Sequence, residues 1–194
     1  MTSHTHDLGA FTALVLVFVL LPELPTVTLL TAITAFGANF IGGLFPDLDQ
    51  QTSDFWDNFR LGPYVAKLVV PVFGGHRHIS HSLVGVFLVG YGAEFLLEFV
   101  SRYVLFELQI DIIWNAFMIG VISHLFLDMF TKAGVPLFWP IDWRVGIPPI
   151  KALRIVSGEG IEKYLVFPGL LLVNAYLFMT YQGKVLEFLR LYIK

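Results

Sequence analysis

Long apolar runs separated by short polar segments dominate the chain. Most of them reach the roughly 20 residues that a helix needs to cross the hydrocarbon core of a bilayer. The run at 164–181 is slightly shorter but carries no formal charge, and the first run is long enough only if its helix begins near His4. The pattern predicts five membrane-spanning helices, at 4–21, 26–45, 79–100, 110–130 and 164–181.

Three further segments are apolar but too short or too broken to span. The segment 64–73 is closed by a proline and two glycines, which predicts an interfacial or re-entrant piece. The segment 134–140 places two prolines beside Phe138 and Trp139, which favours a loop in the headgroup layer, either a lid over a site or a plain anchor. Residues 184–194 mix charged and apolar positions and predict an amphipathic surface helix.

The composition agrees with an all-α, polytopic transmembrane helix bundle that forms one domain over residues 1–194. Hydrophobic residues make up 56% of the chain and charged residues 14%, with a mean hydropathy of +0.74, whereas soluble domains carry about 25% charge. The net charge of −3 argues against a nucleic-acid partner and leaves membrane lipids as the expected surroundings. The absence of cysteine excludes disulfides, thiolate metal ligands and a cysteine nucleophile. No basic region precedes the first apolar run, so we expect that run to be a mature helix.

Lysine and arginine are distributed unevenly among the connecting segments. The segments 46–78 and 131–163 are rich in them, whereas 101–109 holds only Arg102 and 22–25 holds none. The positive-inside rule then places the two basic segments, and the N-terminus beside them, on the cytoplasmic side of the membrane. The basic tail would then fall on the other side of the membrane, which is a mild conflict with the rule. All six histidines would lie at or near the cytoplasmic face.

Two histidine motifs provide candidate chemistry at that face. His124 and Asp128 are four residues apart, so they share one helical face and could grip one metal ion, or form a hydrogen-bonded pair that joins helices. His76, His78 and His81 surround the start of the third span, where imidazoles are common zinc ligands or simply a hydrated loop. Of these three, His78 is the expected bystander.

Carboxylates and one arginine complete the set. Asp47 and Asp49 end the second span, either as metal ligands or as a helix cap, and His6 is a weaker candidate near the N-terminus. Arg77 offers a planar fork of donors for a phosphate, or a salt bridge to Asp47, Asp49 or Asp54. Carboxylates and imidazoles without sulfur suit Zn²⁺ or Mn²⁺, in a one- or two-metal site.

These motifs together resemble the YdjM-like inner-membrane proteins, and the resemblance implies a membrane-bound, metal-dependent hydrolase. It covers residues 5 to about 140, with a serine at 80 where the family usually has threonine and a histidine at 78 where a small residue is common. The matching pieces are Thr5-His6 with Gly9, Phe45-Pro46-Asp47-Leu48-Asp49, His76-Arg77 with Ser80-His81-Ser82, Ser123-His124 with Asp128, and Gly134-Val135-Pro136-Leu137-Phe138-Trp139-Pro140.

A more distant similarity concerns zinc-dependent phospholipase C and its related single-strand nucleases. Those enzymes use, in chain order, a histidine, an aspartate, a histidine and a His-x-x-x-Asp helix to cleave phosphoesters with water held by a metal cluster. The later ligands of their third metal have no match here, so at most part of that cluster is implied. The corresponding residues would be His6, Asp47 or Asp49, His76 or His81, and then His124 and Asp128.

The sequence therefore predicts a hydrolase that acts on a lipid-like phosphoester at the cytoplasmic face. Arg77 would bind the anionic group, with Asp49 and His76 as further catalytic residues. One alternative is a lipid phosphatase of the phosphatidic-acid type with His81 or His124 as nucleophile, although its lysine–arginine signature is missing. Another is a protein without enzymatic activity whose metal clamps helices. The expected ligands of a divalent metal, Zn²⁺ before Mn²⁺ or Mg²⁺, are His6, Asp47, Asp49, His81, His124 and Asp128.

Overall fold

The described part of the chain folds into helices and loops. The computed structural model describes residues 1–50, 56, 62–73 and 77–190, and these contain no β-strand, only two isolated bridges between loop residues. Within them, five helices are long and apolar enough to cross a membrane, which confirms the predicted class. They are α1 (Ser3–Leu20), α2 (Leu29–Leu44) with the 3₁₀ turn η1 (Phe45–Asp49), α5 (Leu83–Ser101), α6 (Ile110–Met129) and α7 (Phe167–Thr180) with the preceding π turn η5 (Glu162–Val166).

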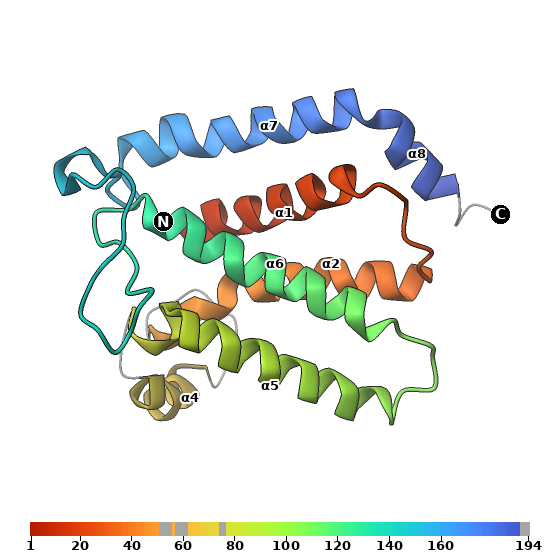
Figure 1. Ribbon diagram of the computed structural model, residues 1–194, viewed down its shortest axis with the longest axis horizontal. Helices are drawn as coiled ribbons and strands as arrows, with labels where there is room; N and C mark the ends of the chain where they lie inside the picture. The colour runs from red at the N-terminus through yellow and green to blue at the C-terminus, as the bar shows by residue number, and fades with distance from the viewer. Residues whose placement is uncertain (51–55, 57–61, 74–76, 191–194) are drawn as a thin grey trace.

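Helix α6 lies at the centre of the bundle (Figure 1), and its closest neighbour is α2. The close approach depends on glycines, because a Cβ on Gly42 would lie 2.1 Å from the carbonyl oxygen of Phe117, and one on Gly120 would lie 2.2 Å from that of Asn39. Small residues are the usual way for membrane helices to pack this tightly. The side chain of Asn39 adds a hydrogen bond of 3.0 Å to the carbonyl of Ala116. The α2–α6 pair is thus the rigid centre of the fold.

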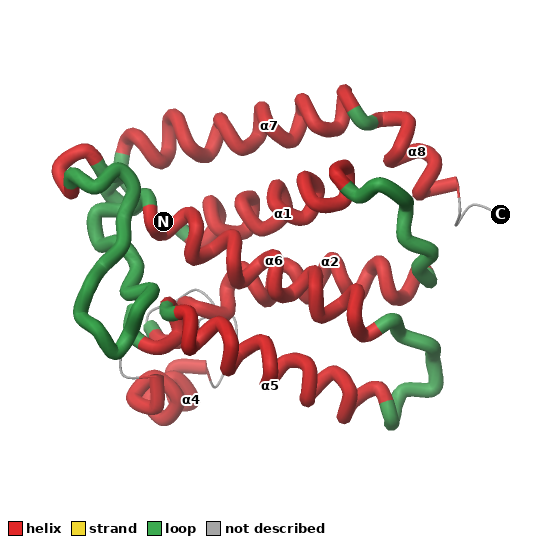
Figure 2. Tube along the Cα trace, in the orientation of Figure 1, coloured by secondary structure: helices red, strands yellow, loops and turns green. Residues whose placement is uncertain are grey.

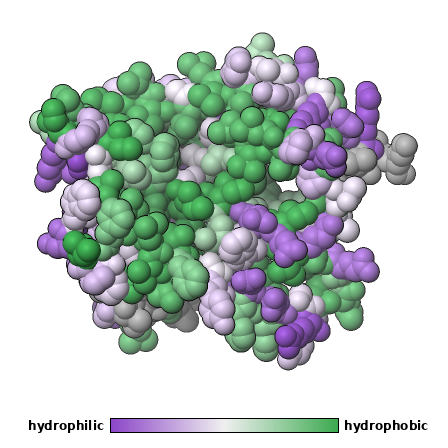
Figure 3. All heavy atoms as spheres, in the orientation of Figure 1, coloured by the Kyte–Doolittle hydropathy of each residue, from purple (hydrophilic) through white to green (hydrophobic). Residues whose placement is uncertain are grey.

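Helices α5 and α7 flank this centre at opposite edges of the bundle. Helix α7 packs on α1, and α5 packs on α6. Large apolar side chains on both remain exposed, among them Phe87 at 73% and Leu172 at 71%. Figure 3 shows apolar atoms over the middle of the molecule and hydrophilic residues gathered toward its two ends. Such a surface suits hydrocarbon rather than water.

The chain alternates between two ends of the bundle (Figure 2). The short connections 21–28 and 102–109 lie at one end, together with α8 (Gln182–Arg190). The N-terminus, η1, the start of α5 and the long loop 130–161 lie at the other, which we call the loop end. The helix α4 (Gly62–Val69) is also at the loop end and is seen end-on in Figure 1, so it lies across the spans, as predicted for a segment too short to cross.

Two span boundaries at the loop end differ from the sequence prediction by four residues. The second span continues past residue 45 through η1 to Asp49. The third span begins at Leu83 rather than at 79, because Ser82 caps α5 through a 3.0 Å hydrogen bond from the amide of Gly85. Residues Ile79–His81 form the separate 3₁₀ turn η3. Both differences place polar residues in short turns at the loop end, where a site can form.

Candidate metal centre

Histidines and aspartates from four segments meet inside the loop end of the bundle. Helix α1 contributes His6, η3 contributes His81, and α6 contributes His124 and Asp128, all of which are at most 1% exposed. Asp47 from η1 completes the group, and its side chain is 19% exposed. Charged groups at such depth are expensive unless they meet partners or an ion. Asp47 is thus the most exposed of these five side chains.

His124 is oriented by the backbone of α2. Its Nδ1 lies 2.6 Å from the carbonyl oxygen of Gly43, and a carbonyl can only accept, so Nδ1 carries a proton. In the neutral ring Nε2 is therefore a bare acceptor. This buried Nε2 has no hydrogen-bond partner among the described residues. It faces the carboxylates of Asp47, at 3.6 Å, and of Asp128, at 3.9 Å.

His81 is oriented in the same way by a carboxylate. Its Nδ1 lies 3.2 Å from Oδ2 of Asp49 and 3.0 Å from the hydroxyl of Ser80, which itself donates to Asp49. On the other side of the ring, Nε2 is 3.7 Å from Asp128 and 3.9 Å from Asp47. A histidine held from behind by a carboxylate, with its second nitrogen turned to the centre, is the usual arrangement of a metal-binding imidazole.

Both carboxylate oxygens of Asp128 are in contact with basic groups. Its Oδ2 lies 2.6 Å from a terminal nitrogen of Arg77, and its Oδ1 lies 3.3 Å from Nε2 of His6 and 2.8 Å from the amino group of Met1. The ring of His6 stacks on that of His124 with centroids 3.7 Å apart. These contacts fix Asp128 between two cationic groups and the imidazoles.

Two overlapping groups of side chains have the spacing of metal ligands. His6, Asp47 and His124 form the first, and His81, His124 and Asp128 form the second. Within each group the potential ligand atoms lie within 4.8 Å of one another. Because His124 belongs to both, the groups describe either one site with alternative ligands or two adjacent sites.

Not every predicted residue takes its predicted place. Asp49 lies behind His81 and belongs to neither group of potential ligands among the described residues. The side chain of Arg77 pairs with Asp128, a partner that the sequence did not suggest, and its backbone amide donates to Asp49 at 2.8 Å. His78 is exposed, as expected of a bystander. His76 and Asp54 lie outside the described residues.

Several contributors to the site could not be found by inspecting ionisable residues alone. The carbonyl of Gly43 has no side-chain signal. Ser80 precedes a candidate ligand, and Thr131 follows Asp128 by three residues, the spacing at which its hydroxyl donates to the Asp128 carbonyl at 2.8 Å. Thr131 also accepts from Arg77 at 2.9 Å. A hydroxyl next to a candidate ligand, or one turn beyond it, is the signal that would have found both.

The loop after α6 packs beside the cluster. Arg77 donates to the carbonyl of Gly134 at 3.4 Å, and Val135 is fully buried against the apolar core of α6. The amide of Leu83 donates to the carbonyl of Leu137 at 3.0 Å, which ties this loop to the start of α5. Phe138 remains 43% exposed. The predicted interfacial loop thus contacts the arginine of the site with one side and exposes an aromatic ring with the other.

The fold and the cluster define a polytopic membrane protein with a buried histidine–aspartate centre at one end of its helix bundle. The chain belongs to the YdjM inner membrane protein family, whose model matches residues 1–185.

Individual relatives agree with this assignment. The chain is 33% identical over 122 residues to the inner membrane protein YdjM of Escherichia coli K12, which covers 63% of this chain and 56% of that protein, and it matches the YdjM of Shigella flexneri to the same extent. It is 32% identical over 146 residues to the uncharacterized protein YvsG of Bacillus subtilis 168, covering 75% and 79% of the two chains. The chain thus spans little more than half the length of the first two relatives. No solved structure matches it.

Proposed function

We propose that the cluster binds a divalent cation and hydrolyses a phosphoester of a lipid-like substrate at the cytoplasmic face of the inner membrane. The observation that carries the proposal is Nε2 of His124, a buried acceptor that faces two carboxylates and has no donor among the described residues. A bound cation would give this nitrogen the partner that it lacks. The name of the Escherichia coli relative supports the inner membrane as the location.

The donor set fits such an ion. Zn²⁺ binds imidazole nitrogen and carboxylate oxygen at about 2.0–2.2 Å, so that two ligand atoms of one tetrahedral ion lie roughly 3.4 Å apart. The separations of 3.6 and 3.9 Å around Nε2 of His124 are close to this value. Imidazole with carboxylate favours Zn²⁺, and Mn²⁺ or Mg²⁺ would accept the carboxylates. When bound, the ion supplies Lewis-acid polarisation of a phosphoryl oxygen and activation of water at neutral pH.

The chain's own residues would supply orientation and charge. Gly43 and Asp49 hold the rings of His124 and His81 with Nε2 turned inward. The guanidinium of Arg77, anchored on Asp128, keeps a positive charge beside the centre, which favours an anionic substrate. Asp47, whose side chain is 19% exposed, would be the ligand that a phosphoester reaches first.

Metal content of point variants tests the proposal. We expect His124→Ala and Asp128→Ala to lose the metal found by elemental analysis of the purified protein, while the helix persists, because alanine is the best helix former. The exposed His78→Ala is the matched control and should retain it. If His124 and Asp128 were only a structural pair, each single change would cost about 1–3 kcal/mol, the double change would recover much of it, and metal content would not change.

Activity assays with chelator separate the proposal from its alternatives. Release of phosphate or headgroup from a lipid phosphoester should stop when the metal is removed and return when Zn²⁺ is restored. Activity that survives chelator would instead favour a covalent histidine nucleophile. Tightly held metal without any hydrolysis would favour a metal that clamps helices.

A further inference from the structure

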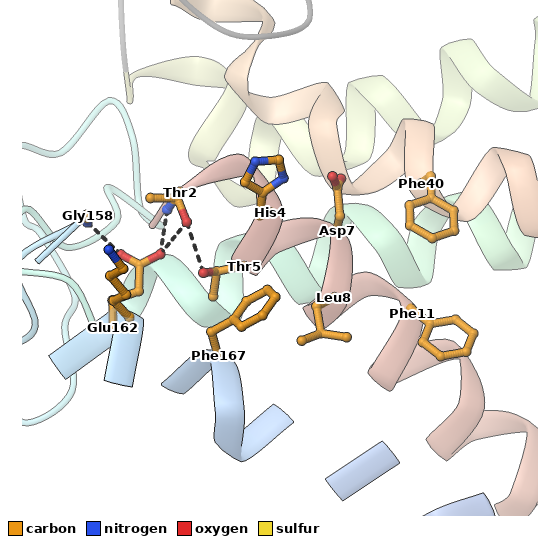
Figure 4. A pocket seen from close by; sticks show the side chains of 11 residues that line it. Thr2, His4, Thr5, Asp7, Leu8, Phe11, Phe40, Gly158, Glu162 and Phe167 are labelled. Carbon is orange, nitrogen blue, oxygen red and sulfur yellow. Dashed lines mark hydrogen bonds between the residues drawn. The ribbon is translucent and has the colours of Figure 1, made fainter. Parts of the chain in front are cut away.

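A groove of about 740 Å³ runs along α1, on the outside of the bundle (Figure 4). Its walls come from α1, from the start of α7 and from Phe40 of α2. The lining side chains of Leu8, Phe11 and Phe167 are half-buried, so the groove opens to the surroundings of the spans. Its size is that of pockets that hold small molecules, about 300–1,000 Å³.

The lining changes from polar to apolar along the helix. Helix α1 begins at Ser3 at the loop end and rises about 1.5 Å per residue into the bundle. Thr5 and Asp7 therefore line the outer part of the groove, and Lys163 of η5 also belongs to the lining. Leu8 and Phe11 line the part that lies deeper in the membrane. An occupant that matches this lining has a polar head at the loop end and a hydrocarbon body.

Hydrogen bonds close the groove at the loop end. The carboxylate of Glu162 accepts from the amide and the hydroxyl of Thr2, at 2.6 and 2.8 Å, and from the amide of Gly158 at 2.8 Å. All three residues line the groove, and Figure 4 shows the bonds between them at one side of it. A spanning helix of a partner would have to continue past this point, whereas a lipid chain ends at its head.

We propose that the groove holds one hydrocarbon chain of a membrane lipid, with the lipid head beside Thr5 and Asp7. His6 lies between these two residues in the sequence but points to the other side of α1, where its Nε2 lies 3.3 Å from Asp128 in the metal centre. The groove and the cluster therefore lie on different sides of α1. The binding of the chain stands on the groove alone and does not depend on the proposed function.

Binding of a single-chain lipid tests the inference. The probe is lysophosphatidylglycerol whose acyl chain carries a photoreactive diazirine, added to the detergent-purified full chain. We expect saturable binding with a stoichiometry near one, and cross-links concentrated on the peptide that holds Leu8 and Phe11. Unlabelled lysophosphatidylglycerol should displace the probe, whereas glycerol 3-phosphate, which has the head without the chain, should not.

Variants of α1 provide the decisive comparison. Leu8→Trp fills the groove and should abolish saturable binding. Leu16→Trp, at a position 43% exposed and two turns further along the same helix, lies outside the groove and should leave binding unchanged. Asp128→Ala should still bind the probe, because the chain site does not need the metal, so failure of the proposed hydrolysis and failure of the groove are distinguishable.

Three results would overturn the inference. They are unchanged binding in Leu8→Trp, displacement by glycerol 3-phosphate alone, and cross-links in the unaltered protein that spread evenly over exposed positions such as Phe87 of α5 instead of gathering on α1. The cross-link map needs no substitution and decides the matter even if Leu8→Trp does not fold.

Discussion

His81 and His124 are both held by acceptors behind them, but the two acceptors differ in kind. The carbonyl of Gly43 is part of α2 and cannot be removed by substitution. The carboxylate of Asp49 depends on its own partners, the hydroxyl of Ser80 and the amide of Arg77. Groups of this supporting kind change metal affinity by about 10–100-fold when they are lost. The orientation of His81 is therefore the more easily altered of the two.

Ser80→Ala tests this supporting role. The change removes a hydroxyl that bonds both Asp49 and Nδ1 of His81, without touching a potential ligand. We expect metal affinity, measured by competition with a chelator of known affinity, to fall by about 10–100-fold. Unfolding temperature at saturating metal should change little.

Ser82→Ala is the matched control, two residues away on the same segment. Its hydroxyl caps α5 and donates to the carbonyl of Ile79, and it belongs to neither group of potential metal ligands among the described residues. Its loss should therefore lower stability by about 0.5–2 kcal/mol and leave metal affinity unchanged. Equal loss of affinity in both variants would show that the cluster responds to any disturbance of this segment, and the specific role of Ser80 would then be rejected.

For single residues, the sequence predicts which side chains gather at the site but not which partner each one contacts. The spacing of His124 and Asp128 is visible because a helix repeats every 3.6 residues. The partner of Arg77 is not, since its backbone adopts a positive φ of 58° that no sequence rule assigns to arginine. This conformation lets its amide reach Asp49 while its side chain reaches Asp128.

Two of the helices that carry the site are held together by glycine contacts. Gly43 can orient His124 only while α2 stays close to α6, and that closeness depends on Gly42 and Gly120. The orientation of His124 in the cluster therefore depends on the packing of α2 against α6. Loosening this pair should affect metal binding as well as stability.

Gly42→Ala and Gly120→Ala test this coupling. Each new Cβ would lie near 2 Å from a backbone oxygen, at 2.1 and 2.2 Å, which only a shift of a helix can relieve. We expect a loss of about 1–3 kcal/mol in stability, seen as a lower unfolding temperature in detergent, together with weaker metal binding.

Gly37→Ala on the same α2 helix serves as the control. A Cβ there meets nothing within 4 Å, and alanine loses less conformational entropy than glycine, so stability should be unchanged or slightly higher. A similar loss in all three variants would point to a general intolerance of α2 rather than to close packing against α6.

Elements were predictable from the sequence where hydropathy decides them. All five spans were found because each buries its backbone polar groups within one helix, which leaves a long apolar run as the only requirement. Their ends were less predictable, since η1 and the cap at Ser82 depend on local hydrogen bonds. Which spans touch was not predicted, because glycine contacts leave no signal in hydropathy.

The two ends of the whole molecule differ in a way that bears on its orientation. The loop end holds the cluster and the long basic loop, and the other end holds short connections and α8. The basic tail there conflicts with a simple count of charges. However, Lys184 donates to the carbonyls of Val19 and Leu21 at the end of α1, so its charge serves as a helix cap. That contact weakens the conflict between the basic tail and the orientation that the positive-inside rule predicts.

We predict that the loop end faces the cytoplasm, because its two connecting segments carry most of the lysine and arginine between the spans. The chain has no cysteine, so single cysteines can report the side of each end without a background. Ala133→Cys lies at an exposed position of the long loop, and Leu105→Cys lies at a position 98% exposed at the opposite end. A membrane-impermeant maleimide should label Leu105→Cys in intact spheroplasts, and Ala133→Cys only in inverted vesicles or after permeabilisation. Labelling of Ala133→Cys alone in intact spheroplasts would place the metal centre on the outer side and remove any cytoplasmic substrate from consideration. Labelling of both positions in intact spheroplasts would contradict a bundle whose connections alternate across the membrane.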